Sequence, residues 1–156
     1  MTRFALTIAV ACTLIIFTDS VANDNPDFRY LEPDGMELPR GSFGLGIVIE
    51  PGYRLAFLTG QIGDDADGNI SADFETQARN ALASVGVLLR EAGMGWPDVV
   101  KINVYLTDNA DLPVWGRVRD EIVGESRPSG TGVIVKALAN PKARVEVTVI
   151  AAQKVE

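Results

Sequence analysis

Histidine is absent from this chain of 156 residues, and cysteine occurs only once, as Cys12. These absences exclude Ser-His-Asp and Cys-His catalysis, a histidine general base, and a zinc site built from histidine and cysteine ligands. Any chemistry therefore has to use carboxylates, arginine, lysine, hydroxyl groups, amides or the backbone.

Basic residues are in the minority. Fourteen Lys and Arg face 21 Asp and Glu, so the formal net charge is -7 and the pI is about 4.6. Proteins that bind nucleic acid normally present a basic surface, because contacts with phosphates dominate the affinity. The composition thus predicts no nucleic-acid partner. The length and the 47% hydrophobic content predict one compact globular domain.

Residues 1–22 have the pattern of a secretory signal peptide. Arg3 precedes a largely apolar stretch from Phe4 to Phe17, and Ser20-Val21-Ala22 places small residues before a cleavage point. That stretch is shorter than the about 20 residues of a membrane span. Cleavage is therefore favoured over an uncleaved anchor. A lipoprotein anchored at Cys12 is favoured still less, because most of the apolar stretch would follow the cysteine.

Cleavage after Ala22 would remove the only cysteine, so the remaining chain could form no disulfide of its own. It would also remove Arg3 and Asp19, one charge of each sign, and leave the formal charge at -7. We expect a periplasmic or secreted protein with no stable membrane anchor. Residues 23–40 contain three prolines and no sustained periodicity, which predicts an extended arm that packs on the domain or stays mobile.

Residues 41–156 are expected to form the domain. Hydrophobic periodicity and turn residues predict, in chain order, strands at 43–49 and 55–59, a helix at 73–92, a strand at 99–107, a helix at 111–123, and strands at 131–138 and 144–152. This ββαβαββ order predicts an α+β fold with two helices on one face of a single sheet. The other face would carry Val99, Tyr105, Val133 and Val135. Because that face is apolar, self-association is expected to cover it.

Three aspartates in residues 64–67, followed by Gly68, suggest a calcium loop at first sight. With Gly68 at the sixth position of an EF-hand loop, the first and twelfth positions fall at Gly63 and Phe74, and neither side chain donates oxygen. The segment is better explained as an acidic surface turn, and no metal site is predicted.

Several separated motifs carry a family resemblance. They are Thr59-Gly60-Gln61-Ile62, Gln77-Ala78-Arg79-Asn80-Ala81-Leu82, Asp98-Val99-Val100-Lys101 running into Val104-Tyr105-Leu106-Thr107-Asp108, Arg127-Pro128-Ser129-Gly130-Thr131-Gly132, and Val145-Glu146-Val147. Together they resemble the reactive-intermediate deaminase family (Rid, or YjgF), whose older name is L-PSP endoribonuclease. The resemblance covers Phe43 to Ala152 and leaves the arm outside.

The resemblance implies a chorismate-mutase-like α+β fold and a homotrimer with ligand clefts between subunits. Active members of the family hydrolyse reactive enamines and imines to 2-oxo acids and ammonia without a cofactor or metal. In them an arginine holds the substrate carboxylate through two hydrogen bonds, and a glutamate positions or polarises the attacking water.

The family's site residues transfer to this chain one by one. The resemblance implies that Glu146 is the glutamate, that Thr59 is the hydroxyl residue before the Gly-Gln pair, and that Phe43 is the aromatic residue near the cleft mouth. Gly116 aligns with a cleft asparagine that some members carry on a helix. Glu146 also has a structural interpretation, as an acceptor for loop amides, and the sequence favours neither role.

The family arginine is missing, because Gly130 stands at its position. Gly130 and Gly132 lie on one face of the predicted strand, with Thr131 between them, so we expect an open, neutral notch. Losing a charge-assisted bond to a carboxylate costs roughly 1.5–3 kcal/mol, or about ten- to a hundredfold in affinity. Arg127 or Arg144 could reach in instead, although a plain surface ion pair is the simpler interpretation of Arg144.

Two functions remain open on the sequence. The first is an exported enamine or imine hydrolase that works through Glu146 and a bound water. The second is a non-catalytic trimer that binds a small molecule in clefts widened by Gly130 and Gly132. RNA cleavage, which only the older family name suggests, is disfavoured by the charge of -7 and the absence of histidine.

Overall fold

The computed structural model describes residues 25, 27–37 and 43–155. The predicted signal peptide at 1–22 and part of the predicted arm lie outside these described residues. Within them, no helix is long and apolar enough to cross a bilayer.

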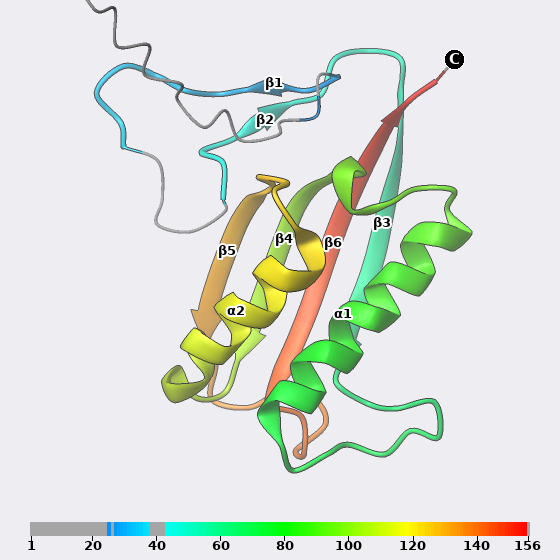
Figure 1. Ribbon diagram of the computed structural model, residues 1–156, viewed down its shortest axis with the longest axis vertical. Coiled ribbons are helices and arrows are strands. Elements are labelled where there is room, and N and C mark those ends of the chain that lie inside the picture. Colours follow the sequence, from blue (N-terminus) through cyan, green and yellow to red (C-terminus); the bar gives the residue numbers. More distant parts are fainter. Residues whose placement is uncertain (1–24, 26, 38–42, 156) are drawn as a thin grey trace, which may run out of the picture.

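The centre of the molecule is a four-stranded sheet in the order β3-β6-β4-β5. Its strands are β3 (Tyr53–Ile62), β4 (Val99–Leu106), β5 (Ser129–Ile134) and β6 (Val145–Lys154). β4 and β5 run parallel, and the other neighbouring pairs are antiparallel. Helices α1 (Phe74–Glu91) and α2 (Leu112–Val123) both lie on one face of this sheet (Figure 1). The predicted α+β fold, with two helices on one sheet face, is confirmed.

Among the described residues, the first predicted strand pairs with the main sheet only through a bridge from Gly44 to Ser129. Only Ile47–Val48 forms a strand, β2, and it pairs antiparallel with β1 (Arg29–Tyr30) in a separate two-stranded sheet (Figure 1). The alternation at 43–49 indicates a strand but not which strand lies beside it, so the expectation that this strand belongs to the single sheet is wrong. The described part of the arm packs on the domain, where Phe28 contacts Val100 and Ala152.

The helix termini follow the residues that predict them. Asp73 caps α1, and its side chain accepts a hydrogen bond from the Thr76 backbone N–H at 2.8 Å. After Ala92, Gly93 adopts a positive φ of 67°, a conformation that ends helices and favours glycine. The core lies between the helices and the sheet and consists of Phe74, Ala78, Ala81, Leu82, Val85, Leu89, Met94, Val99, Ile102, Val104, Leu106, Trp115, Val118, Val145, Val147, Val149 and Ala151.

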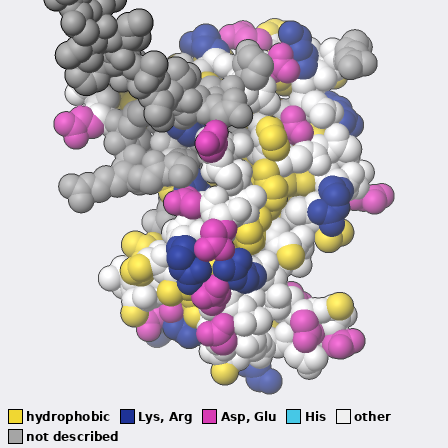
Figure 2. Space-filling model, viewed as in Figure 1, with side chains coloured by type: hydrophobic (Ala, Val, Ile, Leu, Met, Phe, Trp, Pro, Cys, Tyr) yellow, Lys and Arg dark blue, Asp and Glu magenta, His cyan; other side chains and the backbone are white. Residues whose placement is uncertain are grey.

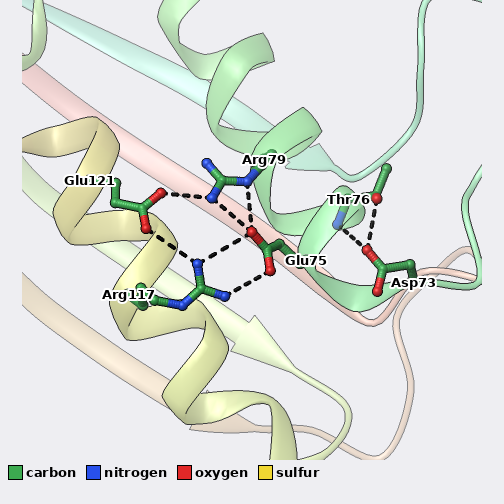
Figure 3. A network of polar contacts seen from close by, with 6 residues as sticks. All are labelled: Asp73, Glu75, Thr76, Arg79, Arg117 and Glu121. Atoms are coloured by element: carbon green, nitrogen blue, oxygen red, sulfur yellow. Dashed lines mark hydrogen bonds and ion pairs between the residues drawn. The ribbon is translucent and has the colours of Figure 1, made fainter.

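Four charged side chains join the two helices on their outer side (Figure 3). Glu75 of α1 pairs with Arg79 and with Arg117 of α2, each at 2.7 Å, and Glu121 completes the group. The hydrogen bonds from Arg117 and Arg79 lower the pKa of Glu75 to about 2. Over the helices, basic and acidic side chains gather beside a strip of hydrophobic ones (Figure 2).

The sheet face away from the helices is covered only in part in the single chain: Phe28 of the arm packs on Val100 and Ala152, whereas other apolar side chains stay exposed. Leu55, Phe57 and Val133 are 49%, 71% and 40% exposed. Val99, which the sequence placed here, instead belongs to the core on the helix side. The pairing of β4 with β6 shifts between Val99 and Lys101, and such an irregularity breaks the simple alternation of side chains.

Candidate functional site

A cavity of about 220 Å³ lies between α2 and the β4–β5 edge of the sheet. It opens on the helix side, and the described residues that line it are Phe43, Val104, Leu112, Trp115, Gly116, Arg119, Asp120 and Gly132. The lining combines an aromatic and aliphatic wall with one basic and one acidic side chain, a composition typical of a small-molecule site.

The cavity brings together three of the residues that the family resemblance selects, namely Phe43, Gly116 and Gly132. Two of them create its space. A Cβ on Gly116 would meet no atom within 4 Å, and one on Gly132 would touch only Val104, at 3.4 Å. Side chains at either position would therefore project into the cavity and narrow it.

Gly130 is not the open notch that the sequence suggests, because the ring of Phe43 fills the space beside it. A Cβ on Gly130 would overlap the ring and lie 2.9 Å from its Cγ. The backbone holds the two residues in place, since the Gly44 N–H donates to the Pro128 carbonyl at 3.2 Å and Gly44 bridges to Ser129. Any larger residue at position 130 would thus have to displace the Phe43 ring.

Arg119 is the site residue that the sequence analysis missed. Its guanidinium carbon lies 4.2 Å from the centre of the Phe43 ring, within cation–π range, and the residue is only 2% exposed. Nη1 pairs with Asp120 Oδ1 at 2.5 Å. Burial lowers the pKa of Arg119, but an arginine stays protonated at neutral pH. The cavity therefore contains a buried cation, which is paired with the Asp120 carboxylate.

A signal for Arg119 was present in the sequence. It lies three residues after Gly116 and four after Trp115, and this spacing places all three on one helix face. A charged residue on a buried helix face is rare unless it is paired or functional.

Neither Arg127 nor Arg144 lines the cavity. Arg127 pairs with Glu32 at 3.0 Å and lies over the ring of Tyr30. Arg144 pairs with the buried carboxylate of Asp111 and lies over Phe74. Both arginines thus contribute contacts outside the cavity.

The remaining predicted residues lie on the opposite face of the sheet. Glu146 pairs in register with Tyr105 and Ile62, whereas Gly132 pairs with Val104, the residue before Tyr105 on β4. Because successive strand residues face opposite sides, Glu146 and the cavity are separated by the sheet within one chain.

The surroundings of Glu146 are close to the Thr-Gly-Gln motif. Its carboxylate lies against Gly60, where an added Cβ would overlap Oε1 and lie 2.9 Å from Cδ. Thr59 is exposed beside it on β3. Thr131, also exposed, accepts a hydrogen bond from Lys101 Nζ at 3.2 Å. One chain therefore places the predicted site residues in two groups.

No group of three or more potential metal-ligating side chains occurs within the part of the chain that the structure describes. The acidic turn at residues 64–68 is stabilised by hydrogen bonds between an aspartate side chain and nearby backbone N–H groups. Asp65 Oδ1 accepts hydrogen bonds from the backbone N–H groups of Asp67 and Asn69, at 3.0 and 2.8 Å.

Comparison with known families gives one match, to a family described as Endoribonuclease L-PSP, over residues 47–153. The chain is 31% identical over 116 residues to the 2-iminobutanoate/2-iminopropanoate deaminase of Bos taurus, a match that covers 72% of this chain and 81% of that protein. It is 35% identical over 102 residues to a RutC family protein of Pyrococcus abyssi, covering 64% and 78%.

Solved structures have the same fold. A Rid family protein of unknown function from Yersinia pestis matches with a TM-score of 0.71 and 24% identity, over 81% of this chain and 99% of that one. Escherichia coli TdcF, solved with bound serine, matches with a TM-score of 0.60 and 27% identity, over 81% and 99%.

Proposed function

The chain belongs to the endoribonuclease L-PSP family, also called the Rid or YjgF family, and we therefore propose that it binds a small imine in the cavity between α2 and β5 and hydrolyses it. The observation that carries this proposal is the convergence of Phe43, Gly116 and Gly132 on one cavity. Similarity to 2-iminobutanoate/2-iminopropanoate deaminases supports the choice of reaction.

The proposed reaction adds water across a C=N bond. Glu146 accepts a proton from the water as the water oxygen attacks the imine carbon, and it returns that proton to the nitrogen, which gives a carbinolamine. Glu146 then passes the hydroxyl proton of this intermediate to the nitrogen, and ammonia leaves as the C–N bond breaks and the C=O bond forms. One imine and one water thus give one oxo compound and one ammonia. No cofactor, metal or redox partner enters this balance.

We further propose that the working form is a homotrimer. In one chain the sheet separates Glu146 from the cavity, so catalysis requires Glu146 of one subunit to face the cavity of the next. The uncovered apolar residues Leu55, Phe57 and Val133 support such an assembly, because burial between subunits removes them from water.

We also propose that the protein is exported from the cytoplasm before it acts. The pattern of residues 1–22 supports a periplasmic or secreted location. The substrate would then be an imine that forms or arrives outside the cytoplasm.

A non-catalytic binding trimer is the second candidate. The observation that favours it is the overlap of Phe43 with the space beside Gly130, which excludes an arginine at the family position while this ring stays in place. Such a protein would bind ligand in the same cavity but leave imines to decay at the uncatalysed rate.

The test is hydrolysis of imines generated in situ from several amino acids, measured above the uncatalysed rate. We expect turnover by the purified protein and its loss in a Glu146→Gln variant of unchanged melting temperature. Imine decay at the uncatalysed rate, in a protein that still binds the oxo-acid product, would instead establish the non-catalytic binder.

A further inference from the structure

We propose that Arg119 is the cation that binds the carboxylate of a small organic acid in this cavity. The assignment deepens the proposed function by naming the ligand class and the residue that selects it. It moves the cation from strand β5, where the family resemblance places it, to helix α2.

The contacts of Phe43 support a cation on helix α2 in place of one on strand β5. The ring fills the space in which a side chain on residue 130 would begin, so a cation cannot enter from β5. The guanidinium carbon of Arg119 lies 4.2 Å from the centre of the same ring. Phe43 thus blocks one position for the cation and supports another, and Phe43 and Arg119 both line the cavity.

The chemistry of the lining defines the ligand class. Among the described residues that line the cavity, Arg119 alone is basic, and most of the others are apolar or lack a side chain: Phe43, Val104, Leu112, Trp115, Gly116 and Gly132. An apolar cavity with one buried cation favours an acid with one carboxylate and a short apolar body. At about 220 Å³ the space is below the range of drug-sized ligands, so a chain of a few carbons fits best.

The Asp120 carboxylate occupies a position on the Arg119 guanidinium for which the carboxylate of the ligand would compete. Its side chain is 50% exposed, whereas the Arg119 side chain is 3% exposed. An entering carboxylate can therefore replace Asp120 on Nη1 while the Asp120 carboxylate turns toward solvent. The guanidinium offers several donors in a planar fork and so matches the two oxygens of a carboxylate.

The experiment measures binding of 2-oxobutanoate and of its uncharged amide by titration calorimetry. We expect the acid to bind the wild type, and Arg119→Met to weaken that binding about ten- to a hundredfold, the value of a charge-assisted bond. Asp120→Asn should have the opposite effect and tighten binding, because it removes the competing anion. Arg117→Met is the matched control, since it removes one positive charge from the exposed side of the same helix.

The Asp120→Asn variant keeps the test decisive if Arg119→Met fails to fold, because Asp120 is half exposed. Equal affinity for the acid and the amide, or weaker acid binding in Asp120→Asn, would overturn the assignment. The two proposals can fail separately. Imine hydrolysis with a KM unaffected by Arg119→Met rejects only the role of Arg119. Acid binding that depends on Arg119, without hydrolysis, rejects only the reaction.

Discussion

The aromatic ring of Phe43 lies over Gly130, at the point where the side chain of any other residue 130 would begin. Any larger residue 130 would have to displace this ring, so the contact is compatible with glycine at this position. It also accounts for the position of Arg119, whose guanidinium lies on the same ring.

The contact between these two residues predicts a strong coupling in stability. Gly130→Ala should lower the free energy of unfolding by about 1–3 kcal/mol, because its methyl group overlaps the ring of Phe43. Phe43→Ala should remove most of that penalty, since the double variant has no overlap. A double-mutant cycle by urea unfolding measures the coupling, and additive effects would show that the ring does not occupy this space.

The glycine at position 116 is predicted to lower the stability of helix α2 and to leave room in the cavity. Gly116→Ala should raise the free energy of unfolding by about 0.5–1 kcal/mol, because glycine weakens a helix interior and the new methyl group meets no atom within 4 Å. Gly116→Leu should weaken ligand binding strongly without unfolding the protein. Unchanged ligand affinity in Gly116→Leu would mean that the ligand binds elsewhere.

Gly60 is predicted to control the position of the Glu146 carboxylate. A methyl group on Gly60 would displace that carboxylate, which is the mobile end of a flexible side chain, so the fold should tolerate Gly60→Ala. We expect a large loss of kcat with a melting temperature close to that of the wild type. Full activity in Gly60→Ala would contradict a catalytic position of Glu146 beside Gly60.

The charged group between α1 and α2 predicts a dependence of stability on pH. Hydrogen bonds from Arg117 and Arg79 lower the pKa of Glu75 from 4.5 to about 2 in the folded protein. Its stabilising effect is therefore complete above about pH 5 and is lost as the pH falls through 2. The difference in unfolding free energy between wild type and Glu75→Gln should shrink over that range, and also in 1 M salt at neutral pH. A difference that stays constant down to pH 2 would exclude this ion pairing.

Much of the fold could be predicted from the sequence, because helix caps and periodicity are local signals. Asp73 and Gly93 marked the ends of α1, and the alternation in 99–107 marked β4. The partner of the strand at 47–48 could not be predicted, since periodicity shows which side chains are buried but not which strand lies beside them.

The candidate site was predicted only in part, for a related reason. Phe43, Gly116 and Gly132 were selected and do meet at one cavity. Their neighbour Arg119 was not, because its role depends on the ring of Phe43, which lies 76 positions away in the chain. The separation of Glu146 from the cavity is likewise a property of strand pairing, which only the structure provides.

The central claim is that the site combines Arg119 of one subunit with Glu146 of another, and a mixing experiment tests it most directly. Arg119→Met and Glu146→Gln variants, each deficient in imine hydrolysis, are unfolded together in equal amounts and refolded to form mixed trimers. In a random mixture about one interface in four carries both native residues, so about a quarter of the wild-type activity should return. Mixed trimers, identified by native mass spectrometry, with no more activity than the separate variants would contradict the account.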